Sequence, residues 1–170
     1  MIQGLHRFLS ESSIVLDLDD RLEIPEELDA MSIRARTDFK RSILKVLVES
    51  FEHSGAIVNP SKLLTDLCNR EAKATTGLGS GMAFPHVRTL QARELVIAVM
   101  KSDQGIYFNS LDEKPVHVFI GMVSPPYDDK MYLKVMSSVG KAMEQGGLMD
   151  VVMNSWTPSQ LMGEFCRLRL

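Results

Sequence analysis

Apolar residues in the first third of the chain recur with the period of a helix. They predict a helix from about Thr37 to Ser54. Thr37 or Asp38 is expected to cap its start, and Gly55 to supply the left-handed residue that stops it. The positions that carry the period, four residues apart, are Phe39, Ile43 and Leu47.

Four further helices are indicated by start and stop signals together with apolar stripes. Asn59-Pro60 begins one that ends near Asn69-Arg70-Glu71. Asp128-Asp129 begins another, which Gly146-Gly147 stops. A short helix is expected over Leu148–Asn154, and Thr157-Pro158 begins a last one. The helix from Asn59-Pro60 is expected to turn Leu63, Leu64 and Leu67 inward. The helix from Asp128-Asp129 is expected to turn Leu133, Met136, Gly140 and Met143 inward, flanked by Val135, Val139 and Ala142. For the last helix, the expected inward residues are Leu161, Met162, Phe165 and Leu168.

Strands are predicted by alternating or continuous apolar residues. Ser13–Asp19 alternates, and Glu94–Met100 contains a buried run. Asp103–Gly105 reads as a turn into a short returning strand, Ile106–Phe108. Val116–Val123 is apolar on both faces and therefore belongs in the centre of the sheet. Asp19–Ser32, broken by Pro25, is expected to be a connection.

This mixture of elements predicts a single α/β domain with a mixed sheet flanked by helices on both faces. We expect residues 13–170 to form that domain and residues 1–12 to be a loosely attached lead-in.

Composition narrows the classes of function. The chain has 170 residues and a net charge of −3, without a dense basic block, which argues against nucleic-acid binding. Its longest apolar run is too short to cross a bilayer, so no membrane insertion is expected. Cys68 and Cys166 lie far apart in helical segments and are interpreted as reduced, buried residues of a cytoplasmic protein. No metal-ligand spacing appears, and no cofactor is expected.

The stretch from Thr75 to Arg88 carries the candidate chemistry. Three glycines at alternate positions permit a sharply bent backbone, and Pro85 biases the residue before it toward an extended conformation. If the chain stays extended, Arg88 lies on the same side as His86. The glycine spacing differs from G-x-G-x-x-G and follows a helix, which disfavours a dinucleotide site. A histidine, a guanidinium and free backbone N–H groups suit a transient negative charge.

From Ser13 onward, the order of elements resembles the fructose/mannitol-type IIA domain of the bacterial phosphoenolpyruvate-dependent sugar phosphotransferase system, including its nitrogen-regulatory branch. Arg70-Glu71 matches the Arg-Glu pair of that family, and Lys114-Pro115-Val116 is similar to the start of its later strand. The family signature Thr-Gly-x-Gly-x-Gly-x-Ala-x-Pro-His is matched by Thr76-Gly77-Leu78-Gly79-Ser80-Gly81-Met82-Ala83-Phe84-Pro85-His86.

The resemblance implies that His86 accepts a phosphoryl group from an HPr-like carrier protein, which holds it on its own histidine. The group then passes to a IIB domain, or it remains as a regulatory mark. Arg70 would be the nearby cation and Arg88 a second one. The residues assigned to phosphate binding beside Arg88 are Thr76, Gly77, Gly79 and Gly81, whose backbone would form an anion nest.

One position departs from the family pattern. Where the family usually has a second histidine beside the phosphorylated one, this chain has Tyr132, whose hydroxyl can donate a hydrogen bond. Three interpretations therefore stay open: a phosphocarrier that passes the group to a IIB domain, a regulatory module, or a degenerate relative that no longer accepts phosphate. The absence of an attached IIB or membrane segment favours the regulatory branch.

Simpler interpretations compete with several of these roles. Arg70-Glu71 can be a surface ion pair, and Arg88 can be a solvent-exposed residue. His117 lies in an apolar strand, where a core or supporting role is expected. His53 is expected at a helix end.

Overall fold

Strand β6 (Val116–Ser124) lies at the centre of the sheet, as its apolar sequence predicts. The computed structural model describes residues 4–26 and 31–168. In it β6 pairs antiparallel with β5 (Val96–Ile106) and parallel with two short strands on its other side, β3 (Met82–Ala83) and β4 (His86–Arg88). Parallel and antiparallel pairs coexist, so the predicted mixed sheet is confirmed.

Two short strands complete the six-stranded sheet. The strand β1 (Ile14–Val15) runs parallel to β5, and β2 (Gly77–Gly79) runs antiparallel to β3, which gives the order β1-β5-β6-β3-β2 with β4 also beside β6. The pairing brings the glycine stretch and the centre of the sheet together.

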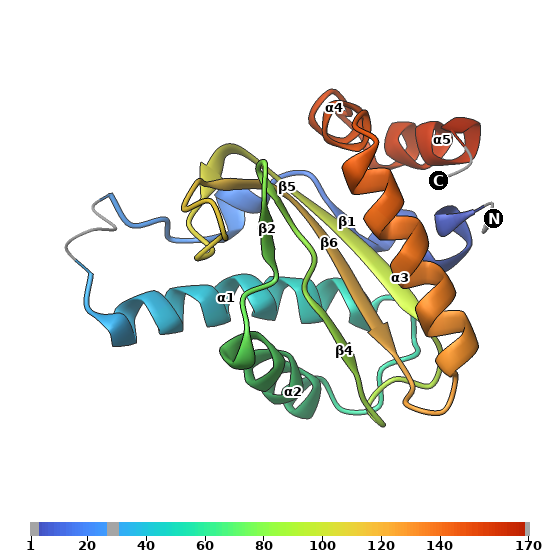
Figure 1. Cartoon of the computed structure of the whole chain (residues 1–170), viewed down its shortest axis with the longest axis horizontal. Coiled ribbons are helices and arrows are strands. Elements are labelled where there is room, and N and C mark those ends of the chain that lie inside the picture. The colour runs from blue at the N-terminus through green and yellow to red at the C-terminus, as the bar shows by residue number, and fades with distance from the viewer. Residues whose placement is uncertain (1–3, 27–30, 169–170) are drawn as a thin grey trace.

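Helices cover both faces of this sheet, as predicted (Figure 1). On one face lie α1 (Ile33–Glu52) and α2 (Pro60–Lys73), and on the other lie α3 (Asp129–Glu144), α4 (Leu148–Met153) and α5 (Pro158–Leu168). Because side chains alternate along a strand, β6 contributes to both layers. Phe119 packs with α1 and α2, whereas Val118 and Ile120 pack with the C-terminal helices.

Helix α1 passes very close to β6 at Gly121. A Cβ built on Gly121 would lie 2.4 Å from Cδ1 of Leu47, which is fully buried. Only a glycine allows this approach of helix and strand. The tight contact fixes α1 on the sheet.

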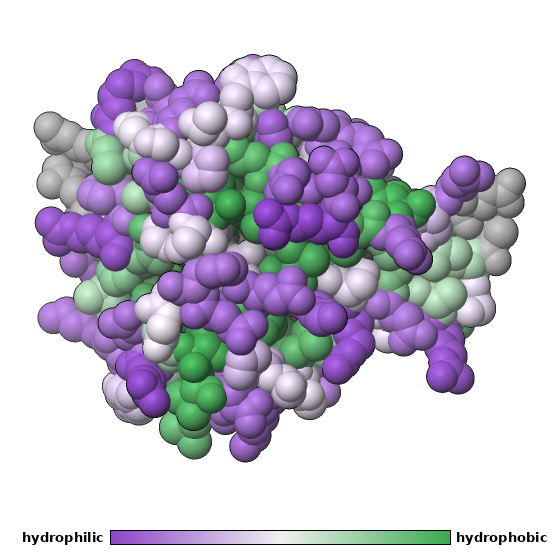
Figure 2. Space-filling view, turned by 180° about the vertical axis from the view of Figure 1, so that it is seen from behind, coloured by the Kyte–Doolittle hydropathy of each residue, from purple (hydrophilic) through white to green (hydrophobic). Residues whose placement is uncertain are grey.

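The face of the molecule seen from behind carries many polar side chains (Figure 2). Seen from behind, apolar areas lie between polar side chains rather than forming one continuous face (Figure 2). Among the described residues, no helix has both the length and the apolar character that a membrane crossing needs.

Helix α1 starts four residues earlier than predicted. Its cap is Ser32, whose Oγ accepts a hydrogen bond from Ala35 N at 3.2 Å. Thr37 is not a cap, because its hydroxyl donates to Ile33 O within the helix. The first turn shows no apolar stripe, so the hydrophobic pattern of the sequence does not predict that the helix includes it. Gly55, at φ +72°, follows the helix end as expected.

The start of α2 is confirmed. Asn59 Oδ1 accepts from Lys62 N at 3.0 Å, and Pro60 occupies the first turn. The helix runs to Lys73, a few residues further than predicted.

The C-terminal helices appear where they were expected, with one change of face. Asp128 caps α3, but Leu133 is 63% exposed, and the residues that α3 buries are Val135, Val139, Ala142 and Met143. The helix is rotated so that its β-branched residues, predicted as flanks, pack on the sheet. Leu161 and Phe165 of α5 are buried as predicted, whereas Leu168 lies outside the residues whose side chains are described.

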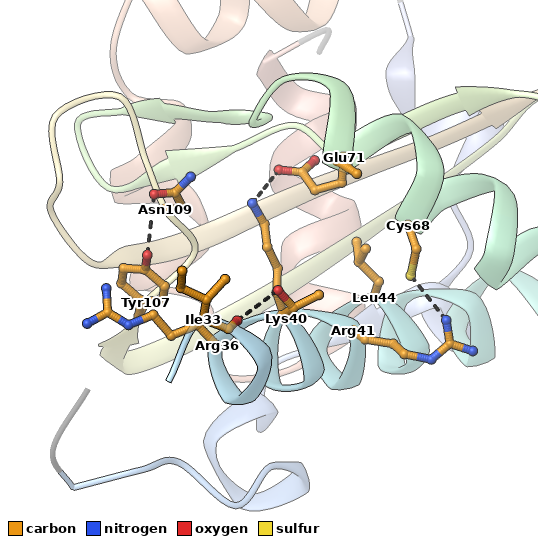
Figure 3. Close-up of a pocket in the computed structure, with 11 residues that line it drawn as sticks. Ile33, Arg36, Lys40, Arg41, Leu44, Cys68, Glu71, Tyr107 and Asn109 are labelled. Carbon is orange, nitrogen blue, oxygen red and sulfur yellow. Dashed lines mark hydrogen bonds and ion pairs between the residues drawn. The ribbon is translucent and has the colours of Figure 1, made fainter. Parts of the chain in front are cut away.

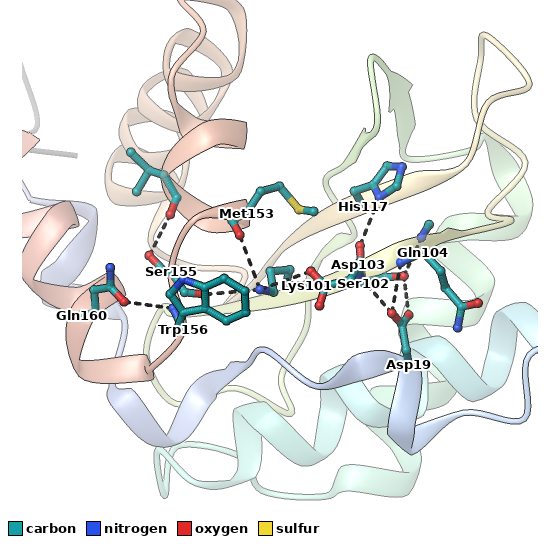
Figure 4. Close-up of polar contacts among 12 residues, drawn as sticks. Asp19, Lys101, Ser102, Asp103, Gln104, His117, Met153, Ser155, Trp156 and Gln160 are labelled. Atoms are coloured by element: carbon teal, nitrogen blue, oxygen red, sulfur yellow. Dashed lines mark hydrogen bonds and ion pairs between the residues drawn. The ribbon is translucent and has the colours of Figure 1, made fainter.

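Strand β5 is longer than predicted, because no reversal occurs at Asp103–Gly105. The irregular segment stays within β5 as a bulge, and Ile106 pairs with Val116 of β6. The carboxylate of Asp19 holds this segment, accepting from Asp103 N at 2.8 Å and Gln104 N at 3.2 Å (Figure 4). The Asp19 carboxylate, distant in the sequence, thus accepts the hydrogen bonds of backbone N–H groups that would bond within a local turn.

The predicted strand at Ser13–Asp19 shrinks to Ile14–Val15. Short 3₁₀ helices flank it at Glu11–Ser13 and Leu18–Arg21, so the predicted alternation does not persist. Ile14 and Val15 are both buried, on opposite faces of the sheet. The expected connection at Asp19–Ser32 lies partly outside the described residues.

Residues 4–12 are attached more firmly than predicted. Leu5 and Leu9 are buried in the core beneath the C-terminal helices. The apolar residues of this segment are too few to show a helical or strand period in the sequence, although Leu5 and Leu9 are buried in the fold. The domain boundary at residue 13 remains a prediction.

Candidate functional site

His86 opens β4, directly after Phe84-Pro85. Its Nδ1 lies 2.7 Å from the carbonyl oxygen of Phe84, which can only accept a hydrogen bond. Nδ1 therefore carries the proton of the neutral ring, and the lone pair lies on Nε2. Burial lowers the pKa of His86 below its ordinary 6.5 against the opposing effect of this hydrogen bond. The imidazole is thus neutral at neutral pH.

Arg70, in the last turn of α2, faces that lone pair. Its Nη2 lies 3.4 Å from His86 Nε2, while its Nη1 donates to Ala74 O at 3.0 Å. The second contact fixes the guanidinium at the helix end. The interpretation of Arg70 as part of a plain surface ion pair with Glu71 does not hold, because the two side chains make separate contacts.

A cavity of about 450 Å³ surrounds these two residues. The structure brings four predicted site residues together there, and it adds three polar residues of α2 that sequence reasoning missed, Asp66, Asn69 and Lys73. Helical spacing could have found Asp66 and Lys73, since they lie four residues before and three after Arg70. The lining residues are Asp66, Asn69, Arg70, Lys73, His86, Val87, Arg88 and Tyr132.

Arg88 and Tyr132 form the far wall of the cavity. Arg88 Nη2 donates to Pro126 O at 2.5 Å and pairs with the carboxylate of Asp129 at the start of α3. Its guanidinium carbon lies 4.9 Å from the centre of the Tyr132 ring, a cation–π contact. Burial raises the pKa of Tyr132, so its hydroxyl stays protonated and can donate. Arg88 is therefore anchored beside His86 on the predicted side.

The predicted anion nest is not at this cavity. Thr76 donates its N–H to Glu71 Oε1 at 2.8 Å and its hydroxyl to Glu71 Oε2 at 2.5 Å. Gly77, Gly79 and Gly81 shape the β2–β3 hairpin, and none of them lines the cavity. Gly77 meets the Ser110 segment so closely that a Cβ there would lie 2.7 Å from Ser110 Oγ. In this structure the glycines permit close packing of the hairpin, and their assignment to phosphate binding remains a prediction.

Other titratable residues lie elsewhere. His117 is half-buried at the opposite end of β6, with Nδ1 3.1 Å from Ser102 O (Figure 4). Cys68 is half-buried, and burial raises the pKa of its thiol. Cys166 is exposed, contrary to the expectation that both cysteines are buried. Within residues 4–26 and 31–168, no group of three metal-ligating side chains occurs.

A second cavity lies on the other side of α2, between α1, α2 and the segment after β5 (Figure 3). Its volume is about 520 Å³, and Lys40, Glu71 and Tyr107 are among its lining residues. The last turns of α2 thus separate two cavities: Arg70 faces one and Glu71 the other. This second cavity does not contain the candidate nucleophile.

Comparison with known proteins connects the site to a family. The family described as "Phosphoenolpyruvate-dependent sugar phosphotransferase system, EIIA 2" matches residues 27–165. A fructose-specific EIIA component of Haloferax volcanii is 25% identical over 116 residues, which cover 68% of this chain and 75% of that protein. A nitrogen regulatory protein of Pseudomonas aeruginosa is 24% identical over 99 residues, or 58% of this chain and 64% of that protein. The fructose-specific EIIABC component of Bacillus subtilis is much longer, and the match spans 19% of it.

Solved structures show the same fold. Nitrogen regulatory protein IIA-Ntr of Neisseria meningitidis superposes with a TM-score of 0.73 at 19% identity, covering 94% of this chain and 97% of that one. The complex of Escherichia coli enzyme IIA for mannitol with phosphorylated enzyme IIB gives a TM-score of 0.65 at 14% identity, with 91% and 96% covered.

Proposed function

The chain belongs to the EIIA 2 family of the phosphoenolpyruvate-dependent sugar phosphotransferase system, and from that premise we propose that His86 Nε2 accepts a phosphoryl group. One observation carries the proposal. The hydrogen bond from Nδ1 to Phe84 O places the ring lone pair on Nε2, which faces the guanidinium of Arg70 across 3.4 Å. A neutral, oriented imidazole with a fixed cation beside it suits attack on phosphorus.

The transfer is a displacement between two histidines. The bond from phosphorus to the donor nitrogen breaks, the bond from phosphorus to His86 Nε2 forms, and the His86 proton stays on Nδ1. The displaced electron pair remains on the donor imidazole. Charge on the phosphoryl oxygens is stabilised by Arg70, by Lys73 and by Arg88, which line the same cavity.

The donor in this proposal is a histidine-phosphorylated, HPr-like carrier protein. The acceptor is a IIB domain, by analogy with the mannitol enzyme IIA that was solved with phosphorylated IIB. With these proposed partners, the protein acts in the cytoplasm. The Tyr132 hydroxyl donates a hydrogen bond to the phosphoryl group, at the position where the family resemblance implies a second histidine.

A regulatory role is the second candidate, supported by Tyr132 and by similarity to nitrogen regulatory proteins. In this alternative His86 accepts phosphate but passes little of it onward, and the phosphorylated surface controls a partner protein. The two functions differ in the fate of the phosphate.

Incubation with phosphoenolpyruvate, enzyme I and an HPr protein tests the first step. Intact-mass spectra are expected to show one added phosphoryl group, labile in acid and stable in base, that disappears in His86→Ala. An unmodified wild-type protein would refute both functions, and a labelled His86→Ala protein would refute the assignment of His86.

Transfer to a panel of purified IIB domains separates the two candidates. A phosphocarrier loses its label to a IIB domain, whereas a regulator retains it. If Tyr132→His transfers and the wild-type protein does not, Tyr132 accounts for retention. If neither transfers, the regulatory function stands and the role given to Tyr132 is wrong.

A further inference from the structure

Glu71 belongs to a chain of buried hydrogen bonds that ends at the nucleophile. We propose that Glu71 is a positioning residue, which acts through Thr76 and Phe84 to keep the proton of His86 on Nδ1 and so leave Nε2 free to react. This inference rests on the proposed function of His86, although its first test does not require phosphorylation.

The first link joins Glu71 to the start of the glycine stretch. Glu71 is 7% exposed and accepts three donors: Thr76 N at 2.8 Å, Thr76 Oγ1 at 2.5 Å and Lys40 Nζ at 2.7 Å. A buried carboxylate is costly unless it is paired and hydrogen-bonded in this way. Two of the three bonds fix one residue, Thr76, which is itself 2% exposed.

The second link joins Thr76 to Phe84. The carbonyl oxygen of Thr76 accepts from Phe84 N at 2.8 Å, across the hairpin formed by β2 and β3. Pro85 restricts Phe84 to extended conformations. With its N–H anchored and its ψ restricted, Phe84 directs its carbonyl toward His86.

The last link is the bond from His86 Nδ1 to that carbonyl, at 2.7 Å. Because a carbonyl cannot donate, the ring must be protonated on Nδ1 for this bond to form. The tautomer therefore depends on where Phe84 points its carbonyl, and that depends on Thr76 and Glu71. Glu71 lies on the opposite side of α2 from the nucleophile and still acts on it.

Lys40 completes the arrangement from α1. Its Nζ reaches Glu71 from the wall of the second cavity (Figure 3). The same Nζ lies 4.4 Å from the centre of the Phe108 ring. The ion pair balances the charge of the Glu71 carboxylate, whose two oxygens both accept hydrogen bonds from Thr76. Removing the negative charge weakens the hold on Thr76 without touching any residue that lines the His86 cavity.

The chain offers a matched control for this argument. Thr89 is also buried, at 6% exposure, and its hydroxyl donates to a carboxylate of α2, Asp66 Oδ2, at 2.5 Å. That bond has the same chemistry as the bond from the Thr76 hydroxyl to Glu71. Its carboxylate, Asp66, lines the His86 cavity, so the control also reports any general disturbance of the cavity, but the bond lies outside the path to Phe84 O. Thr76→Val and Thr89→Val therefore remove equivalent hydroxyls, of which only one belongs to the path.

The first experiment reads the tautomer by two-dimensional ¹⁵N–¹H NMR of the histidine rings at pH 8, where His86 is neutral. The wild-type protein is expected to show Nδ1–H at His86. Glu71→Gln and Thr76→Val are expected to shift the signals toward the Nε2–H form, and Thr89→Val to leave them unchanged. A wild-type spectrum in folded Glu71→Gln and Thr76→Val overturns the inference.

The second experiment measures the rate of phosphoryl transfer from phosphorylated HPr. We expect kcat to fall about tenfold in Glu71→Gln, which weakens every bond to the carboxylate, and about fivefold in Thr76→Val, which removes one of them, with KM for HPr unchanged. An equal fall in Thr89→Val, or a fall without a tautomer change, refutes positioning through Phe84. If Glu71→Gln does not fold, Thr76→Val, which keeps the Lys40–Glu71 pair, decides the question.

Titration of the ring gives a further readout. Around His86 the charged and titratable groups are Asp66, Arg70, Glu71 and Lys73 from α2, Arg88 from β4 and Tyr132 from α3. The negative charge of Glu71 and the bond to Phe84 O both raise the pKa of His86. Glu71→Gln is therefore expected to lower that pKa, and a pKa equal to that of Thr89→Val contradicts the link. Failure of phosphorylation in the wild-type protein would refute the proposed function and leave these two NMR results standing on their own.

Discussion

Replacement of Arg70 by glutamine tests the electrostatic part of the site. The guanidinium Nη2 lies 3.4 Å from His86 Nε2, where a phosphoryl oxygen would come within its reach. Glutamine removes the charge and the fork of donors, while Lys73 and Arg88 remain in the cavity. The substitution therefore removes one cation from a cluster of three.

The expected loss follows from the strength of hydrogen bonds to charged groups. Such bonds contribute about 1.5–3 kcal/mol, and a factor of ten in rate corresponds to about 1.4 kcal/mol. Because Arg70 is half-buried, solvent screens part of this energy, and the lower half of the range applies. We therefore expect transfer to His86 to slow about 10- to 40-fold.

The assay is single-turnover transfer from phosphorylated HPr, followed by intact mass. It is run at pH 8, because Arg70 lowers the pKa of His86 and its removal raises that pKa toward 6.5. At pH 8 both proteins have a neutral imidazole, and the rate reports the transition state alone. Lys62→Gln, an exposed change of equal charge at the start of α2, measures general weakening of association with HPr.

Two outcomes refute the reasoning about Arg70. One is a rate within twofold of the wild type in Arg70→Gln. The other is an equal loss in Lys62→Gln, which would assign the effect to association.

Three further predictions concern stability, measured by chemical denaturation. The pKa of His86 is lower in the folded protein than in the unfolded chain, so the unfolded chain binds more protons as the pH falls below 6.5. The wild-type protein should therefore lose stability below pH 6.5 relative to His86→Gln. Parallel profiles of stability against pH for the two proteins would contradict this. Gly121→Ala forces a Cβ against Leu47 and should destabilise by about 1–3 kcal/mol, whereas Gly140→Ala, in open space within α3, should stabilise by about 0.5–1 kcal/mol; effects of the same sign would contradict the packing. Ser32→Ala should cost about 1 kcal/mol as the loss of the α1 cap, and no measurable loss would contradict the observed start of the helix.

The parts of the fold that sequence predicts well are those fixed by local signals. Asn59-Pro60 and Asp128 start helices because each pairs a side-chain cap with a favourable first turn. The start of α1 was missed because Ile33, directly after Ser32, is 87% exposed and does not extend the apolar stripe. Asp103–Gly105 reads as a turn locally, and only the distant carboxylate of Asp19 keeps it within β5.

The candidate site divides in the same way. His86 is predicted because a motif with fixed spacing, Thr76 to His86, contains it, and Arg70 because the Arg-Glu pair of the resembled family precedes that motif. The glycines are predicted to bind phosphate because free N–H groups of a bent loop suit an anion, but the local sequence does not reveal that Gly77 packs tightly against Ser110. The role of Glu71 depends on hydrogen bonds that join residues from α1, α2 and the hairpin, and no local pattern encodes that meeting.

The parallel pairing of β4 with β6 has a consequence for the newly made chain. His86 lies opposite Met122, whose N–H donates to Pro85 O at 3.0 Å, so the strand that supports the histidine is synthesised after it. Parallel pairing between distant segments forms late in folding, because the entropy of loop closure is lost before the non-local contacts stabilise the chain. A nascent chain that has not yet supplied β6 cannot hold His86 against Arg70. In our proposal, the chain can therefore accept phosphate only after β6 has been synthesised and has paired with β4.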